Sequence, residues 1–192
     1  MMVFVCERVI AASVIAVFAA VMVDFAKYGD RGAVKKGRRS IVATGSMIGF
    51  FAVFCLVIYL RWGSIHFDDA IAMTMIIAGT SMVFAGAAMN IAGRLRLGGN
   101  WANHIRIYDG HTLVRRGIYK IVRHPLYASI MLMLFGGSVA YRNWLGAVLA
   151  ACVFVPFMYY RAKQEERLLQ EEFAEYGEYR KKTGMFFPKL WR

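Results

Sequence analysis

Two apolar runs separated by a single arginine decide the fold: residues 126–141 are LYASIMLMLFGGSVAY and residues 143–160 are NWLGAVLAACVFVPFMYY. A helix rises about 1.5 Å per residue, so each run approaches the length that crosses a hydrocarbon core of about 30 Å. Lipid offers no partner for backbone N–H and C=O groups, so both runs should be helical. They predict a tight pair of transmembrane helices.

Three further apolar stretches precede this pair, at residues 3–26, 41–60 and 70–92. Of the 192 residues, 59% are hydrophobic and only 19% are charged, which excludes a disordered chain and a soluble domain. The expected fold class is all-α: one membrane domain, residues 1–192, with five transmembrane helices. Residues 1–92 would form three spans, and residues 93–192 a connector, the last two spans and a C-terminal amphipathic helix. A cleaved signal peptide is an alternative for the first stretch, but Glu7 and Arg8 interrupt it.

Basic residues predict the orientation in the membrane. The segments 27–40, 93–125 and 161–192 hold 21 of the 24 Lys and Arg residues. Because basic loops stay on the cytoplasmic side, we expect the N-terminus outside and the C-terminus in the cytoplasm. The net charge of +12 then reflects this asymmetry and contact with anionic membrane lipid, so nucleic-acid binding is discarded.

Small residues in the second to fourth spans, such as Gly79, Gly86 and Gly136, allow helices to approach closely in lipid. We expect them to pack the bundle internally rather than to form a dimer face. Pro156 in the fifth span should kink that helix and open a gap toward the lipid.

Residues whose side chains can bind a ligand or take part in catalysis concentrate in two segments, 93–127 and 161–183, both expected on the cytoplasmic side. The connector is long for a compact bundle, and it contains many apolar residues, so it should fold into a site. At its end, Pro125 suits the first turn of a helix, and the N-terminus of that helix is a site for anions. Arg123 adds a forked donor for a carboxylate or phosphate. An alternative is that Arg123 contacts a lipid phosphate while His124 caps the helix.

The second segment begins RAKQEERLLQEEF at residues 161–173. Leu169, Phe173 and Tyr176 follow at spacings of four and three, which predicts an amphipathic helix. Glu165 and Glu166 lie one turn after Arg161, next to the bilayer, where charged residues tend to be functional.

Other cofactor chemistries are disfavoured by the sequence. The four histidines lack the spacing of a zinc site and have no cysteine nearby, so we expect no metal centre. No Gly-rich fingerprint lies between a strand and a helix, so a nucleotide-bearing cofactor would bind without a Rossmann fold.

Residues 110–127, GHTLVRRGIYKIVRHPLY, are followed by the two spans and then by Glu165-Glu166-x-x-Leu169-x-x-x-Phe173. This arrangement resembles the isoprenylcysteine carboxyl methyltransferase family, whose wider relatives include phospholipid methyltransferases. The resemblance covers about residues 97–188. It implies a membrane methyltransferase that uses S-adenosyl-L-methionine at the cytoplasmic face.

The resemblance, together with the anion site, implies specific roles for residues. The expected cofactor-binding residues are His111, Leu113, Val114, Gly117, Tyr119, Arg123, His124, Pro125, Tyr127, Glu165 and Glu166. Arg161 is the expected catalytic residue, near the reacting group of the substrate. Two departures from the family pattern stand out. Ser129 replaces a frequent glycine, and Tyr176 and Tyr179 each lie one residue closer to Phe173 than usual, which turns a helix by about 100°.

The acceptor class follows from the chemistry of methyl transfer. A carboxylate is already ionised and needs only an orienting cation and a dry site, whereas an amine must first lose a proton. Arg161 therefore favours a carboxylate on a lipophilic or prenylated substrate that enters from the membrane. Three alternatives remain: N-methylation of a phospholipid amine, an NADPH-dependent membrane reductase with a similar Arg-x-Pro-x-Tyr ending, and a non-enzymatic membrane scaffold.

Overall fold

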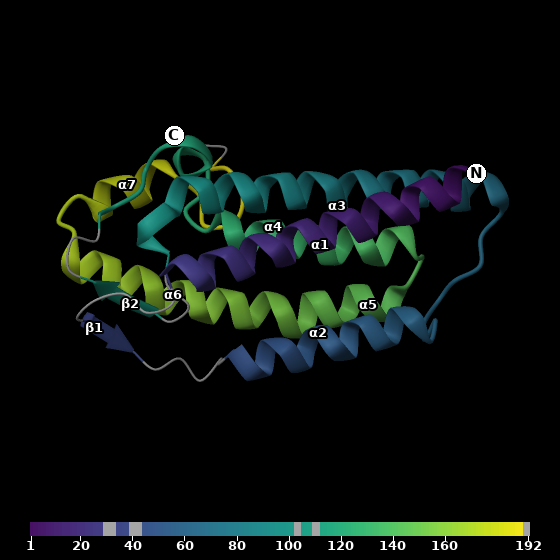
Figure 1. The fold of residues 1–192 in the computed structure, drawn as a ribbon, viewed down its shortest axis with the longest axis horizontal. Helices are drawn as coiled ribbons and strands as arrows, with labels where there is room; N and C mark the ends of the chain where they lie inside the picture. Colours follow the sequence, from purple (N-terminus) through teal and green to yellow (C-terminus); the bar gives the residue numbers. More distant parts are fainter. Residues whose placement is uncertain (29–33, 39–43, 102–104, 109–111, 190–192) are drawn as a thin grey trace.

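The computed structural model describes residues 1–28, 34–38, 44–101, 105–108 and 112–189. Its helices are α1 (Met2–Tyr28), α2 (Thr44–Tyr59), α3 (Asp69–Leu97), α4 (Pro125–Ala140), α5 (Trp144–Leu149), α6 (Val155–Glu172) and α7 (Tyr176–Lys182). A π-helical segment, Ala150–Phe154, joins α5 to α6. Figure 1 shows the long helices side by side, with α7 and the strands at one end and the N-terminus at the other. The predicted helical architecture is confirmed.

Within the described residues, three helical segments are long and apolar enough to cross a membrane: Met2–Tyr28, Asp69–Asn100 and Trp144–Glu172. Helices α2 and α4 are apolar but shorter. Large hydrophobic side chains lie exposed on the outside of the bundle; Phe18 is 65% and Phe84 61% exposed. Such exposure suits contact with lipid, and the chain is an integral membrane protein. A count of five spans stays a prediction.

Helix α3 packs against α1 and α4. A Cβ atom placed on Gly79 would lie 2.7 Å from the Cα of Ala140, and one on Gly86 would lie 2.8 Å from the carbonyl oxygen of Ser129. On α4, a Cβ on Gly136 would lie 2.8 Å from the carbonyl oxygen of Gly79. Only glycine permits these approaches, so the predicted role of small residues in packing the bundle is confirmed at these three positions.

Two short strands were not predicted. Strand β1 (Val34–Arg38) pairs antiparallel with β2 (Ile105–Tyr108), and both strands contact α6. The pairing joins the segment after α1 to the connector after α3, at the end of the bundle that also carries α7 (Figure 1). This small sheet is an addition to the predicted helical architecture.

The tail differs from the single amphipathic helix that we expected. Helix α6 continues without a break from the membrane segment to Glu172, and Phe173 then adopts an extended backbone with φ −116° and ψ 110°. Tyr176 therefore begins a separate helix, α7. The helix is also irregular just before Pro156, where the π-helical segment ends at Phe154. A proline lacks the N–H that would bond the preceding turn, which accounts for an irregularity at this place.

Candidate active site

A cavity of about 1750 Å³ lies within the bundle and is lined by residues of α1, α2, α3, α4 and α6. Its middle is apolar, with Val17, Phe51 and Ile76 among the lining residues. At one end the lining is charged and aromatic: Tyr119, Arg123, His124, Pro125, Tyr127, Arg161 and Glu165. The cavity therefore offers a polar end and an apolar passage to the same ligand.

The Arg-His-Pro turn begins α4. Pro125 is the first residue of the helix, as predicted. The backbone N–H of Arg123 donates to the carbonyl of Gly184 at 2.9 Å, and that of His124 donates to the carbonyl of Met185 at 3.1 Å. The tail thus returns to hold the turn through its backbone, a contact that has no signature in side-chain patterns.

Arg123 is bound inside the protein. Its Nε donates to Oε1 of Glu166 at 2.7 Å, and its Nη1 donates to the carbonyl oxygens of Thr183 and Arg180. The side chains of Arg123 and Glu166 are only 7% and 4% exposed. The alternative in which Arg123 contacts a lipid phosphate is therefore wrong, because the side chain is buried and its Nε and Nη1 are bound to Glu166 and the tail carbonyls.

His124 lies between the two glutamates. Its Nε2 is 3.3 Å from Oε1 of Glu166, and its Nδ1 is 3.5 Å from Oε2 of Glu165. Burial alone lowers the pKa of His124, but the hydrogen bonds and charges of Glu165 and Glu166 outweigh it, and the pKa is raised. The side chain makes no capping hydrogen bond to α4, so the capping alternative is also wrong. The two carboxylates favour the protonated imidazole.

Tyr127, Glu165 and Arg161 form the second half of the cluster. The hydroxyl of Tyr127 donates to Oε1 of Glu165, and Nε of Arg161 is 3.5 Å from the same oxygen. The guanidinium carbon of Arg161 is 6.0 Å from the centre of the Tyr127 ring. The ring of His124 stacks on that of Tyr127, with centroids 5.6 Å apart. The two predicted motifs therefore meet, and both glutamates are paired with cations.

The tail tyrosines support the site from behind. Tyr176 and Tyr179 are buried, and the hydroxyl of Tyr179 donates to the carbonyl of Tyr119 at 2.6 Å. Burial raises the pKa of Tyr119, and it raises the pKa of Tyr179 to about 12. Neither tail tyrosine lines the cavity. Both tyrosines lie one residue closer to Phe173 than in the family pattern. They can still pack behind the site, because they belong to a separate helix, α7.

Three predicted residues, Leu113, Val114 and Gly117, lie apart from this cluster. Gly117 has a φ of +62°, which favours glycine, and a Cβ there would lie 3.1 Å from Nε of Arg96. Leu113 and Val114 are half-buried and do not line the cavity. His111 lies outside the described residues. Cofactor contacts by these four stay predictions.

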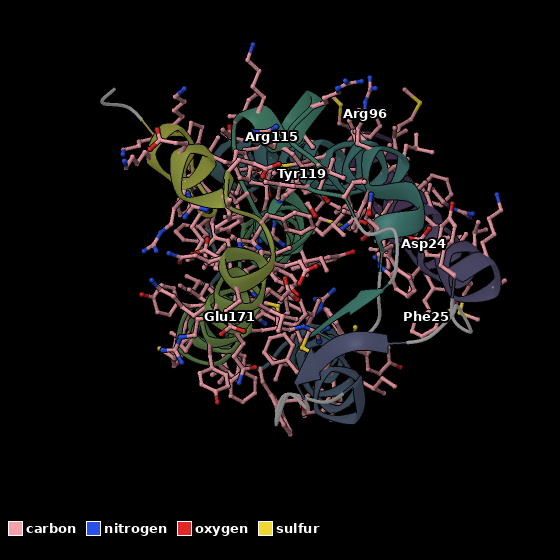
Figure 2. The ribbon with its side chains drawn as sticks, turned by 90° about the vertical axis from the view of Figure 1, so that its left-hand side faces the viewer. Asp24, Phe25, Arg96, Arg115, Tyr119 and Glu171 are labelled. Atoms are coloured by element: carbon pink, nitrogen blue, oxygen red, sulfur yellow. The ribbon has the colours of Figure 1, made fainter. Side chains whose placement is uncertain are left out.

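A buried polar chain was missed. Nη1 of Arg94 is 2.5 Å from Oδ2 of Asp24, Nε of Arg94 donates to Oδ1 of Asn90 at 2.8 Å, and Nδ2 of Asn90 donates to Oγ of Ser129 at 2.7 Å. Figure 2, which looks along the bundle, labels Asp24 and Tyr119 on separate elements, and Arg94 and Tyr119 line the same cavity. The signal was present, because polar residues inside apolar stretches are rare and tend to be functional. Ser129, the departure from the family pattern, is thereby satisfied.

Comparison with known proteins agrees with this arrangement. The model of the isoprenylcysteine carboxyl methyltransferase family matches residues 75–171, half of the chain. A probable protein-S-isoprenylcysteine O-methyltransferase of Oryza sativa subsp. indica is 28% identical over 184 residues, which cover 89% of this chain and 94% of the relative. Protein-S-isoprenylcysteine O-methyltransferase B of Arabidopsis thaliana is 29% identical over 113 residues, 57% of each chain. The cobalt-zinc-cadmium resistance protein CzcN of Cupriavidus metallidurans is 31% identical over 106 residues, 55% of this chain and 47% of its own. With the two motifs joined in one site, this chain belongs to the isoprenylcysteine carboxyl methyltransferase family and is a methyltransferase.

Proposed function

We propose that the protein methylates the carboxylate of a lipophilic acceptor of the isoprenylcysteine type, with S-adenosyl-L-methionine as the donor, at the cytoplasmic membrane face. One observation carries the proposal: a single cavity joins the charged cluster to an apolar passage between the helices. A prenylated carboxylate needs both parts, because its chain must stay out of water while its reacting group meets a charged donor. Family membership and the names of the plant relatives point to the same class of substrate.

The residues of the cluster fit the donor. S-adenosyl-L-methionine has a carboxylate, an ammonium, a cationic sulfur and an adenine. The N-terminus of α4 with His124 suits the carboxylate. Glu165 lines the cavity and is the acceptor for an ammonium or a ribose hydroxyl, whereas Glu166 does not line the cavity, although its buried Oε2 has no hydrogen-bond partner among the described residues. The ring of Tyr127 suits the sulfonium or the adenine. When bound, this cofactor would supply an electrophilic methyl group on a cationic sulfur.

The residues of the cavity then have to hold the donor and the acceptor and orient them toward each other. The ionised acceptor carboxylate would take this methyl group without first losing a proton, so the chain need not supply a base. Arg161 lies at the cavity wall, where its guanidinium would orient the carboxylate. Positioning of this kind supplies about 7–11 kcal/mol in well-oriented reactions. The apolar walls exclude water, which strengthens each of these electrostatic contacts.

An amine acceptor suits the cluster less well. It would need a base, and the candidates are Glu165 and Glu166. Each is held by cations or donors: Glu166 by Arg123 and His124, and Glu165 by His124, Tyr127 and Arg161. Carboxylates stabilised in their charged form are weak bases, which supports the carboxylate acceptor over a phospholipid amine.

The proposed topology has five spans with the N-terminus outside. Helices α2 and α4 would complete the set, although they are short. In Figure 1 the N-terminus and the connection between α2 and α3 lie at one end, and α7 and the sheet lie at the other. The positive-inside rule assigns the latter end to the cytoplasm.

The experiment that tests the function uses purified protein in lipid vesicles with S-adenosyl-L-methionine labelled in its methyl group and N-acetyl-S-farnesyl-L-cysteine. Label that base releases as methanol identifies an ester and supports the proposal. Because this acceptor has no free amine, the vesicles also contain phosphatidylethanolamine, and label that base does not release from the lipid fraction identifies N-methylation and contradicts the carboxylate. A thermal-shift assay adds a control: stabilisation by S-adenosylhomocysteine is expected, whereas stabilisation by NADPH alone favours a reductase and stabilisation by neither favours a scaffold.

A further inference from the structure

Arg94 is a buried cation that the proposed mechanism does not use. It lies on α3, one turn before the end of the helix, and is 9% exposed. It belongs neither to the Arg-His-Pro turn nor to the pair of glutamates. A charged side chain buried in a membrane bundle is costly and marks a functional site unless packing alone explains it.

The partners of Arg94 hold it without consuming all its donors. Nη1 of Arg94 donates to Asp24 of α1, and Nε donates to Asn90, which lies one turn earlier on α3. Asp24 and Asn90 are themselves 7% and 0% exposed. The second terminal nitrogen, Nη2, has no partner among the described residues. A guanidinium has five N–H donors, so the donors of Nη2 are available to a ligand.

The lining of the cavity places Arg94 at the proposed active site. Arg94 lines the same cavity as His124, Arg161 and Glu165. Phe25 and Trp101 line the cavity too, and their rings are 5.0 Å apart in an edge-to-face contact. Figure 2 shows Asp24 and Phe25 together at the end of α1.

The same contacts fix the direction of Arg94 relative to α4. Nδ2 of Asn90 donates to Ser129, and Oγ of Ser129 donates to the carbonyl of Leu126 at 2.7 Å. Leu126 lies in the first turn of α4, between Pro125 and Tyr127. Asn90 therefore links the guanidinium to the helix turn that also carries the cofactor-binding residues, and little rotamer freedom of Arg94 remains to be lost when a ligand binds.

We propose that Arg94, held in place by Asp24 and Asn90, is a second anion-binding side chain of the cavity and takes a carboxylate of a ligand bound there. The inference rests on the proposed function, which brings two carboxylates to this cavity, that of the methyl acceptor and that of the donor. If Arg94 binds the acceptor carboxylate, replacing Arg94 should weaken binding of the acceptor. If it binds the donor carboxylate, the replacement should weaken binding of the donor.

The test measures dissociation constants for two pairs of ligands on the full chain in nanodiscs. In the acceptor pair, N-acetyl-S-farnesyl-L-cysteine is compared with its carboxamide. In the donor pair, S-adenosylhomocysteine is compared with methylthioadenosine, which lacks the amino-acid group. The variants are Arg94→Gln, the double variant Asp24→Asn with Arg94→Gln, and Arg96→Gln as the control. Arg96 lies on the same helix, is exposed and does not line the cavity.

We expect Arg94→Gln to reduce the affinity for the charged member of one pair by about tenfold or more and to leave its uncharged counterpart within about twofold, as expected for a charge-assisted hydrogen bond. An effect on the farnesylcysteine acid assigns Arg94 to the acceptor, and an effect on S-adenosylhomocysteine assigns it to the donor. Arg96→Gln should change neither pair. If Arg94→Gln fails to fold, the double variant, which leaves no unpaired charge, decides the outcome.

The inference is overturned if both pairs keep their wild-type affinities, or if the uncharged ligands lose as much affinity as the charged ones, since Arg94 would then be structural. If the wild-type protein binds neither donor nor acceptor analogue, the proposed function fails instead. The two failures are thus distinguishable.

Discussion

Replacing Arg123 by methionine removes the guanidinium that holds Glu166 below the N-terminus of α4. Glu166 would keep His124 at 3.3 Å and a distant Arg180 at 3.9 Å, but it would lose its shortest contact, the 2.7 Å bond from Arg123. Breaking a buried ion pair costs about 3–5 kcal/mol, because the remaining charge is left poorly compensated. For a chain of this length, each kcal/mol lowers the melting temperature by about 2–4 °C, so we expect a fall of about 6–20 °C.

The coupling between the two side chains is measured with a double-mutant cycle. Arg123→Met, Glu166→Gln and the double variant are unfolded thermally in the same detergent, without ligand. A charged hydrogen bond contributes about 1.5–3 kcal/mol, and the double variant should therefore be more stable than the sum of the single effects predicts.

Lys181 and Glu178 supply a matched control. Their N···O distance is also 2.7 Å, but their side chains are 74% and 65% exposed. Because water screens such a pair, Lys181→Met and Glu178→Gln should be nearly additive. If the Arg123–Glu166 cycle is as additive as this exposed pair, burial does not strengthen the contact and the reasoning about the cluster is refuted.

Three further predictions concern packing, protonation and catalysis. Gly136→Ala should destabilise the protein by about 1–3 kcal/mol, because its Cβ would overpack α3, whereas Gly137→Ala, with no atom within 4 Å, should not; equal melting temperatures would contradict this account. Because the folded pKa of His124 is raised, its contribution to stability should be complete below the unfolded pKa of about 6.5 and should disappear as pH rises through the folded pKa. Melting temperatures measured from acid to alkaline pH should show that loss, and His124→Gln should remove it; an unchanged profile in the variant would exclude His124 as its source. Arg161→Ala should abolish methyl transfer yet leave binding of S-adenosylhomocysteine largely intact by calorimetry, and loss of binding would instead make Arg161 a cofactor-binding residue.

The helices were predictable because lipid imposes a strong constraint on sequence. The predicted stretch 3–26 became α1 (Met2–Tyr28), and 126–141 became α4 (Pro125–Ala140). An apolar run that must satisfy its own backbone has no common alternative to a helix. The break at Phe173 was not predictable in this way: helical spacing continues through Leu169, Phe173 and Tyr176, but the backbone of Phe173 is extended and Tyr176 begins α7.

The meeting of the two motifs was predicted, but several of their contacts were not. Charge asymmetry and the family resemblance place Arg123 and Glu166 on one side of the membrane, but they do not specify which cation contacts which carboxylate. The Asp24–Arg94 pair shows the same limit, since a charge in an apolar stretch indicates that a partner exists without naming it. The backbone bonds from the tail to the Arg-His-Pro turn carry no side-chain signal at all.

The geometry of the cluster also bears on the choice of acceptor. Glu165 and Glu166 are consecutive, so their side chains point in directions about 100° apart around α6. A group that contacts both carboxylates must therefore lie between these two directions. The ring of His124 does so, with one nitrogen toward each carboxylate, and only its protonated form donates from both nitrogens.

With His124 protonated, three cations, Arg123, His124 and Arg161, face two carboxylates, and the half-exposed Arg180 lies 3.9 Å from Glu166, so the cluster carries a net positive charge. A donor with a sulfonium, an ammonium and a carboxylate adds another positive charge. An anionic acceptor then lowers the net charge of the loaded site, whereas an ammonium raises it further. In a cavity of low dielectric constant this difference is large, and it favours entry of the carboxylate before any contact specific to the acceptor is made.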